Sequence, residues 1–298
     1  MKKYIFPLLM LTLLLGGCMK KNEVGQYRVA AILPQNATIH ATDYWVKVWE
    51  GIHAGAKDSS LLLSEYEIDD QYTAQDYLEM ALEADLDGLI INASPGIRED
   101  LVQIRQQGCK VLALDSDPGE EVYDIFVGID NAASARALCE HMLSLYEGGK
   151  ILLLKVDASG AVKERIEAFT EAVMQAGLSE ALLPLEMREE NEERIEDMQR
   201  MLEQGEDITQ IVSFDPSCTL QAAECISRLK LSEQVFLAGF GEFASAGSYM
   251  EDGTIDALLE QDNVALGKTA AEAVGRLLEG KEPVEKRYYV DTHLSMGG

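Results

Sequence analysis

The chain has 298 residues, and its 52 acidic against 25 basic residues give a formal net charge of −27. A hydrophobic fraction of 47% is that of a folded protein and excludes wholesale disorder, while the length suggests two domains. The excess of negative charge argues against binding to nucleic-acid phosphates and against a surface that lies flat on anionic lipid.

The N-terminal segment has the layout of a secretory signal peptide. Lys2 and Lys3 precede an apolar run at residues 4–15. As a helix this run would reach about 18 Å, which is too short for a bilayer core of about 30 Å. The Leu-Gly-Gly-Cys sequence that ends at Cys18 resembles a bacterial lipobox.

The lipobox implies a lipid anchor. We expect residues 1–17 to be removed, the thiol of Cys18 to carry diacylglycerol, and residues 18–26 to form a tether. The protein would then sit on the outer face of a bacterial cytoplasmic membrane. The alternative is an ordinary secretory signal followed by an incidental cysteine.

The other four cysteines do not indicate a metal site. No Cys-x-x-Cys pair occurs, and no histidine stands in metal-ligand spacing. We expect buried thiols that pack as small hydrophobic side chains, and neither a metal nor a cofactor. These cysteines are Cys109, Cys139, Cys218 and Cys225.

From Tyr27 onward, apolar strand-like runs alternate with amphipathic helical segments. In chain order the first half predicts a strand at 28–33, a helix at 42–57, a strand at 61–68, a helix at 73–84, a strand at 88–92, a helix at 97–107, strands at 110–115 and 125–129, and a helix at 131–146. The alternation then restarts.

The second half repeats the same pattern. It predicts a strand at 150–156, a helix at 162–176, a strand at 182–186, a helix at 191–204, a strand at 210–214, a helix at 216–229, a strand at 235–239 with a short helix after it, a strand at 254–259, a helix at 263–279 and a final strand at 286–291. Continuous apolar strands between amphipathic helices indicate parallel sheets covered on both faces.

The predicted fold class is α/β, with two doubly wound lobes divided near residues 130–150, because one sheet of this many strands would be unusual. Ligands of such sheets bind beyond the carboxyl ends of the strands. The two sets of strand ends can face each other across a cleft.

Side chains at these strand ends suit a ligand rich in hydroxyl groups. Carboxylates, amides and an arginine can donate to and accept from each hydroxyl, and flat aromatic faces suit the C–H faces of a sugar ring. Each residue taken alone is about as well explained by a helix cap, a turn or an anchor of its helix. The candidates are Tyr44, Trp45, Asn92, Asp115, Arg165, Asp215 and Gln261.

Six short motifs occur in a characteristic order: Gly88-Leu89-Ile90-Ile91-Asn92-Ala93, Val111-Leu112-Ala113-Leu114-Asp115, Val127-Gly128-Ile129-Asp130-Asn131, Arg165-Ile166-Glu167-Ala168-Phe169, Leu237-Ala238-Gly239-Phe240-Gly241, and Gln261 followed by Gly267-Lys268-Thr269-Ala270. Over about residues 27–295 the chain resembles the type 1 periplasmic sugar-binding proteins, the ribose-binding protein group. That group shares its fold with the effector domains of lac-repressor-type regulators.

The resemblance implies a role for each candidate. The aromatic pair would stack on the sugar, and the family's third-strand Asn, fourth-strand Asp, hydroxyl-binding Arg and last-crossing Gln fall on Asn92, Asp115, Arg165 and Gln261. Three positions depart from the ribose group. Ser116 stands where Arg is frequent, Asp215 before Pro216 stands for the Asn of an Asn-Asp pair, and Gly241 replaces an Asp. These changes make ribose itself doubtful.

The resemblance also implies three crossings between the lobes, near Asp130, Gln261 and Asp291. The N-terminal lobe would comprise residues 27–130 and 262–290, and the C-terminal lobe residues 131–261 and 291–298. A sugar would bind between them and hinge closure would bury it.

The expected function is that of a lipid-anchored, non-enzymatic, monomeric solute-binding protein that delivers a sugar to an ABC permease. The alternative on the same fold is a receptor that presents its ligand to the outer domain of a sensor kinase, and a furanosyl quorum signal is a further ligand option.

Residues 239–244 fit the dinucleotide pattern GxGxxA after a strand, which leaves a dehydrogenase as a weaker alternative. A hydrolase is disfavoured because GxSxG is absent.

Overall fold

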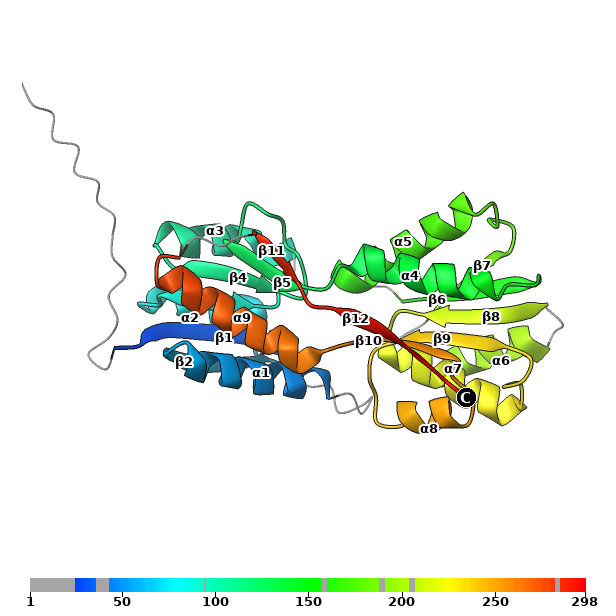
Figure 1. Ribbon diagram of the computed structural model, residues 1–298. Coiled ribbons are helices and arrows are strands. Elements are labelled where there is room, and N and C mark those ends of the chain that lie inside the picture. Colours follow the sequence, from blue (N-terminus) through cyan, green and yellow to red (C-terminus); the bar gives the residue numbers. More distant parts are fainter. Residues whose placement is uncertain are drawn as a thin grey trace, which may run out of the picture.

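The computed structural model describes residues 25–35, 43–93, 95–156, 160–187, 191–203, 207–281 and 285–298. The predicted signal peptide, Cys18 and most of the predicted tether lie outside these residues. Two α/β lobes stand side by side and are joined by connecting segments between them (Figure 1).

The first lobe contains a sheet of parallel strands in the order β11-β5-β4-β3-β1-β2. Its strands are β1 (Tyr27–Pro34), β2 (Leu61–Ile68), β3 (Gly88–Ile91), β4 (Lys110–Leu114), β5 (Ile125–Gly128) and β11 (Arg287–Tyr289). Its helices are α1 (Tyr44–Asp58), α2 (Ala74–Glu83), the short 3-10 turn η2 (Pro95–Ile97), α3 (Arg98–Gln106) and α9 (Asn263–Leu278).

The second lobe contains a sheet in the order β12-β10-β9-β8-β6-β7. Its strands are β6 (Lys150–Lys155), β7 (Leu182–Glu186), β8 (Ile208–Ser213), β9 (Phe236–Phe240), β10 (Ala257–Gln261) and β12 (Thr292–Met296). Its helices are α4 (Asn131–Ser144), α5 (Gly160–Gln175), α6 (Asn191–Glu203), α7 (Pro216–Leu229) and α8 (Ala246–Glu251).

The inner strands of both sheets are buried on both faces, as the sequence predicted, whereas the edge strands β2 and β7 are partly exposed. In β1, Val29, Ala31 and Leu33 share a core with α1 and α9, whereas Ala30 and Ile32 share one with α2 and α3. Successive side chains of a strand point to opposite faces, so a strand with helices on both sides must be apolar throughout.

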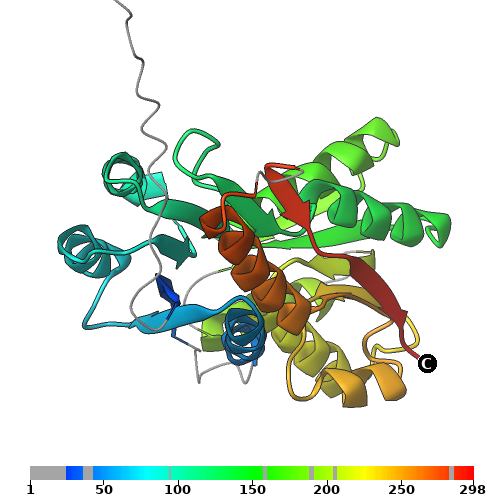
Figure 2. The same cartoon turned by 60° about the vertical axis from the view of Figure 1, so that its left-hand side comes forward.

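Helices α1 and α9 pack backbone to backbone on one face of the first sheet, and they run beside each other in Figure 2. Glycines make this possible. A Cβ atom on Gly267 would lie 2.0 Å from the carbonyl oxygen of Val48, and one on Gly51 would lie 2.0 Å from that of Val264. The close packing fixes the start of α1, and with it Tyr44 and Trp45, against the first sheet.

Two strands differ from the prediction. Strand β10 begins at Ala257, later than expected, because the N–H groups of Thr254 and Ile255 both donate to the carbonyl of Tyr249, at 2.8 and 2.9 Å, and close a turn there. Gln261 is therefore the last residue of the strand and does not follow it.

The predicted last strand at residues 286–291 is shorter in the structure, and a further strand follows it in the other lobe. Residues 287–289 form β11, which extends the first sheet in parallel, and residues 292–296 form β12, which pairs antiparallel with β10 in the second. The sequence analysis missed β12 because its side chains are only partly buried at a sheet edge and give no continuous apolar run.

The chain crosses between the lobes more than once. It passes from the first lobe to the second between β5 and α4, returns between β10 and α9, and passes over again between β11 and β12 (Figure 1). The carboxyl ends of the parallel strands of each lobe face this junction.

Candidate functional site

A cavity of about 390 Å³ lies between the lobes at the strand ends. Six of the seven predicted site residues line it, three from each lobe: Tyr44, Trp45, Asp115, Arg165, Asp215 and Gln261. The other lining residues are Pro34, Gln35, Pro216, Ser217, Phe240, Gly241, Glu242 and Asn263. Its volume is within the range of small-molecule sites.

Aromatic rings form part of the cavity wall. Tyr44 and Trp45 begin α1 and meet edge to face, with ring centroids 4.7 Å apart. Both are half-buried and also pack against the core of the first lobe, so they anchor the helix as well as line the cavity. Phe240, at the end of β9, lines the cavity from the second lobe.

Asp115 follows β4 in a left-handed conformation, with φ at +67°. Its N–H donates to the carbonyl of Val127 at 2.8 Å, which holds this backbone in place. Non-glycine residues seldom adopt this conformation, although Asp tolerates it better than most. Residues with strained backbone conformations cluster at functional sites.

Opposing effects act on the pKa of the Asp115 carboxyl group. Burial raises the pKa of its carboxyl group, while the positive charge of Arg165 and hydrogen bonds from Tyr44 and Asn92 lower it; burial dominates and the pKa is raised. A ligand hydroxyl that donates to the carboxylate would favour its ionised form.

Tyr44 links Asp115 to the second lobe. Its hydroxyl hydrogen-bonds the Asp115 carboxylate and accepts a hydrogen bond from Nε2 of Gln261 at 3.1 Å. Burial, followed by the nearby charge of Asp115, raises the pKa of the Tyr44 phenol well above its ordinary value, so the phenol stays protonated. The nitrogen Nε2 of Gln261 also donates to Oδ1 of Asn263 at 3.0 Å.

Arg165 is the buried cation of the site, with 4% of its surface exposed. Nη1 donates to Oδ1 of Asn131 at 2.7 Å, Nη2 donates to the carbonyl of Phe214 at 3.4 Å, and Cζ lies 3.8 Å from the centroid of the Phe240 ring. Its buried Nε has no hydrogen-bond partner among the described residues. An unpaired buried donor is costly, so a ligand oxygen here would be favourable.

Asp215 serves two purposes. Its Oδ1 caps α7 by accepting from the N–H of Cys218 at 2.9 Å and from the hydroxyl of Ser217 at 2.7 Å. The helix-cap alternative is therefore correct for this oxygen. Asp215 also lines the cavity.

Asn92 does not line this cavity. Its Nδ2 donates to the carbonyl of Leu114 at 3.0 Å and lies 3.5 Å from Oδ2 of Asp115 and 3.4 Å from Oγ of Ser116. Asn92 instead lines a neighbouring hollow. Its position beside the Asp115 carboxylate gives it a part in orienting that group.

Several site residues were missed by the sequence analysis. Asn131, which orients Arg165, directly follows Asp130 in a motif that was noted only for the resemblance. Lys47 forms an ion pair with Glu242, which joins α1 to the loop after β9 across the cavity. No sequence signal links two residues so far apart in the chain.

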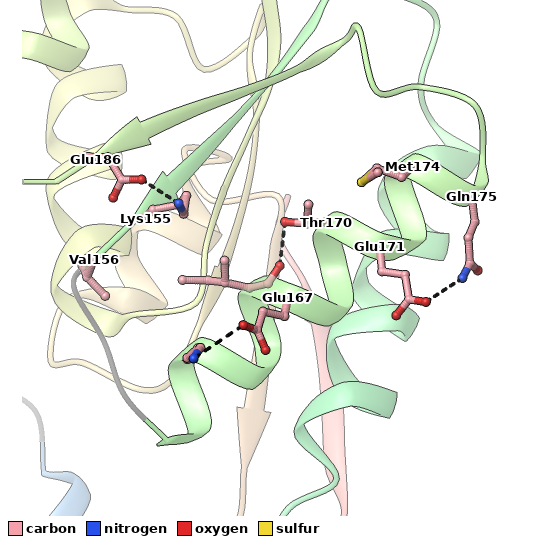
Figure 3. Close-up of a pocket in the computed structure, with 10 residues that line it drawn as sticks. Lys155, Val156, Glu167, Thr170, Glu171, Met174, Gln175 and Glu186 are labelled. Atoms are coloured by element: carbon pink, nitrogen blue, oxygen red, sulfur yellow. Dashed lines mark hydrogen bonds and ion pairs between the residues drawn. The ribbon is translucent and has the colours of Figure 1, made fainter.

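A larger groove, of about 980 Å³, lies outside the cleft along α5 (Figure 3). Its charged side chains pair with one another, as in the ion pair of Lys155 with Glu186 at 2.6 Å and that of Lys163 with Glu167 at 3.8 Å. Every lining residue belongs to the second lobe, so this groove does not lie between the lobes.

The described residues show neither a metal site nor a membrane span. Within them no group of three or more His, Cys, Asp or Glu side chains could hold a metal ion, and none of their helices is long and apolar enough to cross a bilayer. The four described cysteines are buried and form no disulfide with one another, and burial raises the pKa of Cys109 to about 12 and that of Cys139 to about 11.

The GxGxxA segment lacks the structure that dinucleotide binding needs. That motif requires a helix beginning at its glycines. Here α8 starts only at Ala246 and has six residues, and Phe243 is buried in the core of the second lobe.

Comparison with known proteins identifies the architecture. The profile of a family described as periplasmic binding protein domain matches residues 36–282. No curated protein matches the chain.

Among solved structures, a glucose-galactose binding protein from Geobacillus stearothermophilus superimposes with a TM-score of 0.78 at 17% identity, covering 91% of this chain and 97% of that one. A carbohydrate transporter solute-binding protein from Agrobacterium radiobacter, in complex with D-arabinose, gives a TM-score of 0.77 at 16% identity, covering 92% and 95%. The XylFII-LytSN complex gives 0.74 at 17% identity, covering 91% and 98%. These likenesses confirm the predicted two-lobed α/β fold.

Proposed function

Because this chain belongs to the periplasmic binding protein domain family, we propose that it is an extracytoplasmic solute-binding protein that holds a sugar between its lobes and delivers it to an ABC importer. It acts by binding and release, as a monomer, and converts no substrate. Tyr44, Trp45, Asp115, Arg165, Asp215 and Gln261 contact the sugar, and Asn92 positions Asp115.

One observation carries the proposal: Trp45, Asp115 and Arg165, which are distant in sequence, line the same cavity between the lobes. The cavity combines aromatic faces with carboxylates, a guanidinium group and an amide. Sugar hydroxyls act as both donor and acceptor, and such groups can satisfy them in pairs. The sugars in the names of two similar structures, glucose-galactose and D-arabinose, support the same ligand class.

Binding and closure are coupled in this mechanism. Each lobe offers half of the polar groups, so a sugar that binds one lobe gains its remaining hydrogen bonds only when the other lobe closes over it. The ligand favours the closed form by its difference in affinity for the two forms. The closed surface is then the form that a permease recognises.

A thermal-shift screen of pentoses, hexoses, oligosaccharides and polyols tests the ligand class. A cognate sugar at about 100 times its Kd should stabilise the fold by about 2.7 kcal/mol, which corresponds to a rise in Tm of about 5 °C or more. If no member of the panel raises the Tm, the sugar-binding proposal is wrong.

Lipid anchoring through Cys18 and a position on the outer face of a bacterial cytoplasmic membrane complete the proposal. They are supported by the signal-peptide layout and the Leu-Gly-Gly-Cys sequence.

A receptor for a sensor kinase is the second candidate, since one similar structure is solved as a complex, that of XylFII with LytSN. Uptake of the bound sugar separates the two. Deletion of the gene should abolish high-affinity uptake if the protein serves an importer, and should instead leave uptake unchanged while a transcriptional response is lost if it serves a sensor.

A further inference from the structure

A second hollow, of about 380 Å³, lies next to the sugar cavity. It is found where β2, β3 and β4 end and where α2 begins, and Gly160, the first residue of α5, contributes to its wall from the other lobe. This hollow therefore belongs mainly to the first lobe and is bordered by the second lobe at Gly160. Its size is at the lower end of the range for ligand sites, as is that of the sugar cavity.

The two hollows border each other at Asp115 and Ser116. Asp115 lines the sugar cavity, whereas Ser116, the next residue, lines the second hollow together with Asn92. The Nδ2 atom of Asn92 lies 3.5 Å from Oδ2 of Asp115 and 3.4 Å from Oγ of Ser116. A ligand bound to the Asp115 carboxylate would thus have the second hollow within reach.

Small side chains keep the second hollow open. Ala74, Ala93, Ser116 and Gly160 all line it. A Cβ atom on Gly160 would lie 3.1 Å from Oγ of Ser116, so even a methyl group there would crowd the contact between the lobes.

The lining of the second hollow also suits a sugar ring. Its neutral polar groups include the amides of Asn92 and Gln75 and the hydroxyl of Ser116, and Ile68 and Ile97 supply apolar surface. The hydroxyl of Thr73 is engaged with Asp76 in the cap of α2. Asp117 is engaged elsewhere, in an ion pair with Arg287 at 2.6 Å. Neutral hydrogen-bonding groups beside apolar surface match hydroxyls and C–H faces of a second, uncharged ring.

We infer that the two hollows form one bipartite site and that the ligand is a disaccharide, with one ring in the cavity of Tyr44, Trp45 and Arg165 and the other beside Asn92 and Ser116. This inference rests on the proposed function and names the size class of its ligand.

Isothermal titration calorimetry with paired sugars tests it. The pairs are D-glucose with cellobiose, D-galactose with β-1,4-galactobiose, and D-xylose with xylobiose. At least one disaccharide should bind about tenfold more tightly than its own monosaccharide, because the second ring adds buried contacts.

The variant Ala74→Phe places a large side chain in the second hollow, at a residue that does not line the sugar cavity. It should weaken disaccharide binding about tenfold while changing monosaccharide binding less than about twofold. Ala137→Phe places the same side chain on an exposed position of α4 outside both hollows and should change neither. Should Ala74→Phe unfold, Ala74→Leu provides the same test with a smaller side chain.

The outcomes distinguish the two proposals. Monosaccharide binding without any gain for a disaccharide would overturn the bipartite site alone, as would an Ala74→Phe variant that affects both sugar classes equally. If neither class binds, the sugar-binding proposal fails and the inference fails with it.

Discussion

Arg165 contributes most of the positive charge in the cavity. Burial lowers the pKa of its guanidinium group, and Asp115, Tyr44, Asp215 and Glu164 oppose this by raising it. Arginine stays protonated throughout the physiological range. The cation is therefore buried with a carboxylate nearby and with one donor, Nε, unpaired among the described residues.

Replacing Arg165 with Ala should weaken sugar binding by about 30-fold or more with little loss of fold. The substitution removes the charged donors and leaves Asp115 without its cation, a loss worth about 2 kcal/mol or more, or about 30-fold in Kd. Calorimetry with the sugar found in the thermal-shift screen measures the change. The Tm of the ligand-free variant shows that it is folded, and an unchanged Kd would remove Arg165 from the site.

Helices α1 and α9 set the geometry of the first lobe at the scale of elements. They come from opposite ends of the chain, yet their backbones are in contact at Gly51 and Gly267. Because α1 begins with Tyr44 and Trp45, the spacing of the two helices also positions the aromatic wall of the cavity.

Gly267→Ala should destabilise the protein. The new Cβ would lie 2.0 Å from the carbonyl oxygen of Val48, a backbone atom that moves only if α1 moves. Overpacking of this kind costs about 1–3 kcal/mol, which urea denaturation can measure.

Gly247→Ala is the matched control for that prediction. Gly247 also lies in a helix, α8, but nothing stands within 4 Å of its added Cβ. It should leave stability unchanged or raise it by up to about 1 kcal/mol, because alanine favours helix more than glycine does. Equal effects of the two substitutions would contradict the importance of the helix contact.

The two lobes touch at several points on the scale of the whole molecule. Lys47 of the first lobe pairs with Glu242 of the second, Gln261 donates to Tyr44, and Gly160 lies against Ser116. All of these contacts border the two hollows, so opening the lobes would break them and expose both. A ligand that bridges the lobes adds its own bonds to this set, which is the physical basis of closure.

The proposed membrane anchor also belongs to the scale of the whole molecule, since it would determine where the lobes meet a partner. Cys18→Ala should abolish metabolic labelling of the protein with radioactive palmitate. Cys109→Ala, which removes a buried thiol of the first lobe, should leave the label in place. Label retained by Cys18→Ala would show that the cysteine is not lipidated.

Much of the fold could be predicted because each signal was local. Continuous apolar runs predicted the buried strands, and helix periodicity predicted helices such as 216–229, which α7 matches at both ends. Strand β12 gave no such signal, because an edge strand with partly buried side chains depends on its partner β10.

The candidate site was predictable for a related reason. Parallel strands direct their carboxyl ends to one edge, so polar residues such as Asp115 and Asp215 could be selected by their position after a strand. Asn92 met the same criterion and lies behind the cavity, in the second hollow. A position directly after a strand predicts that a residue lies at the carboxyl edge of the sheet, but it does not predict which hollow along that edge the residue lines.

The sequence by itself determined the alternation of strands and helices, the two lobes and most of the polar residues between them, because these follow from periodicity and from order along the chain. Only the tertiary structure decided that residues 292–296 pair with β10 as a strand, that Asn131 holds Arg165, that Lys47 meets Glu242, and that a second hollow opens beside the first. Those features depend on distances between residues far apart in sequence, and such distances exist only once the chain has packed.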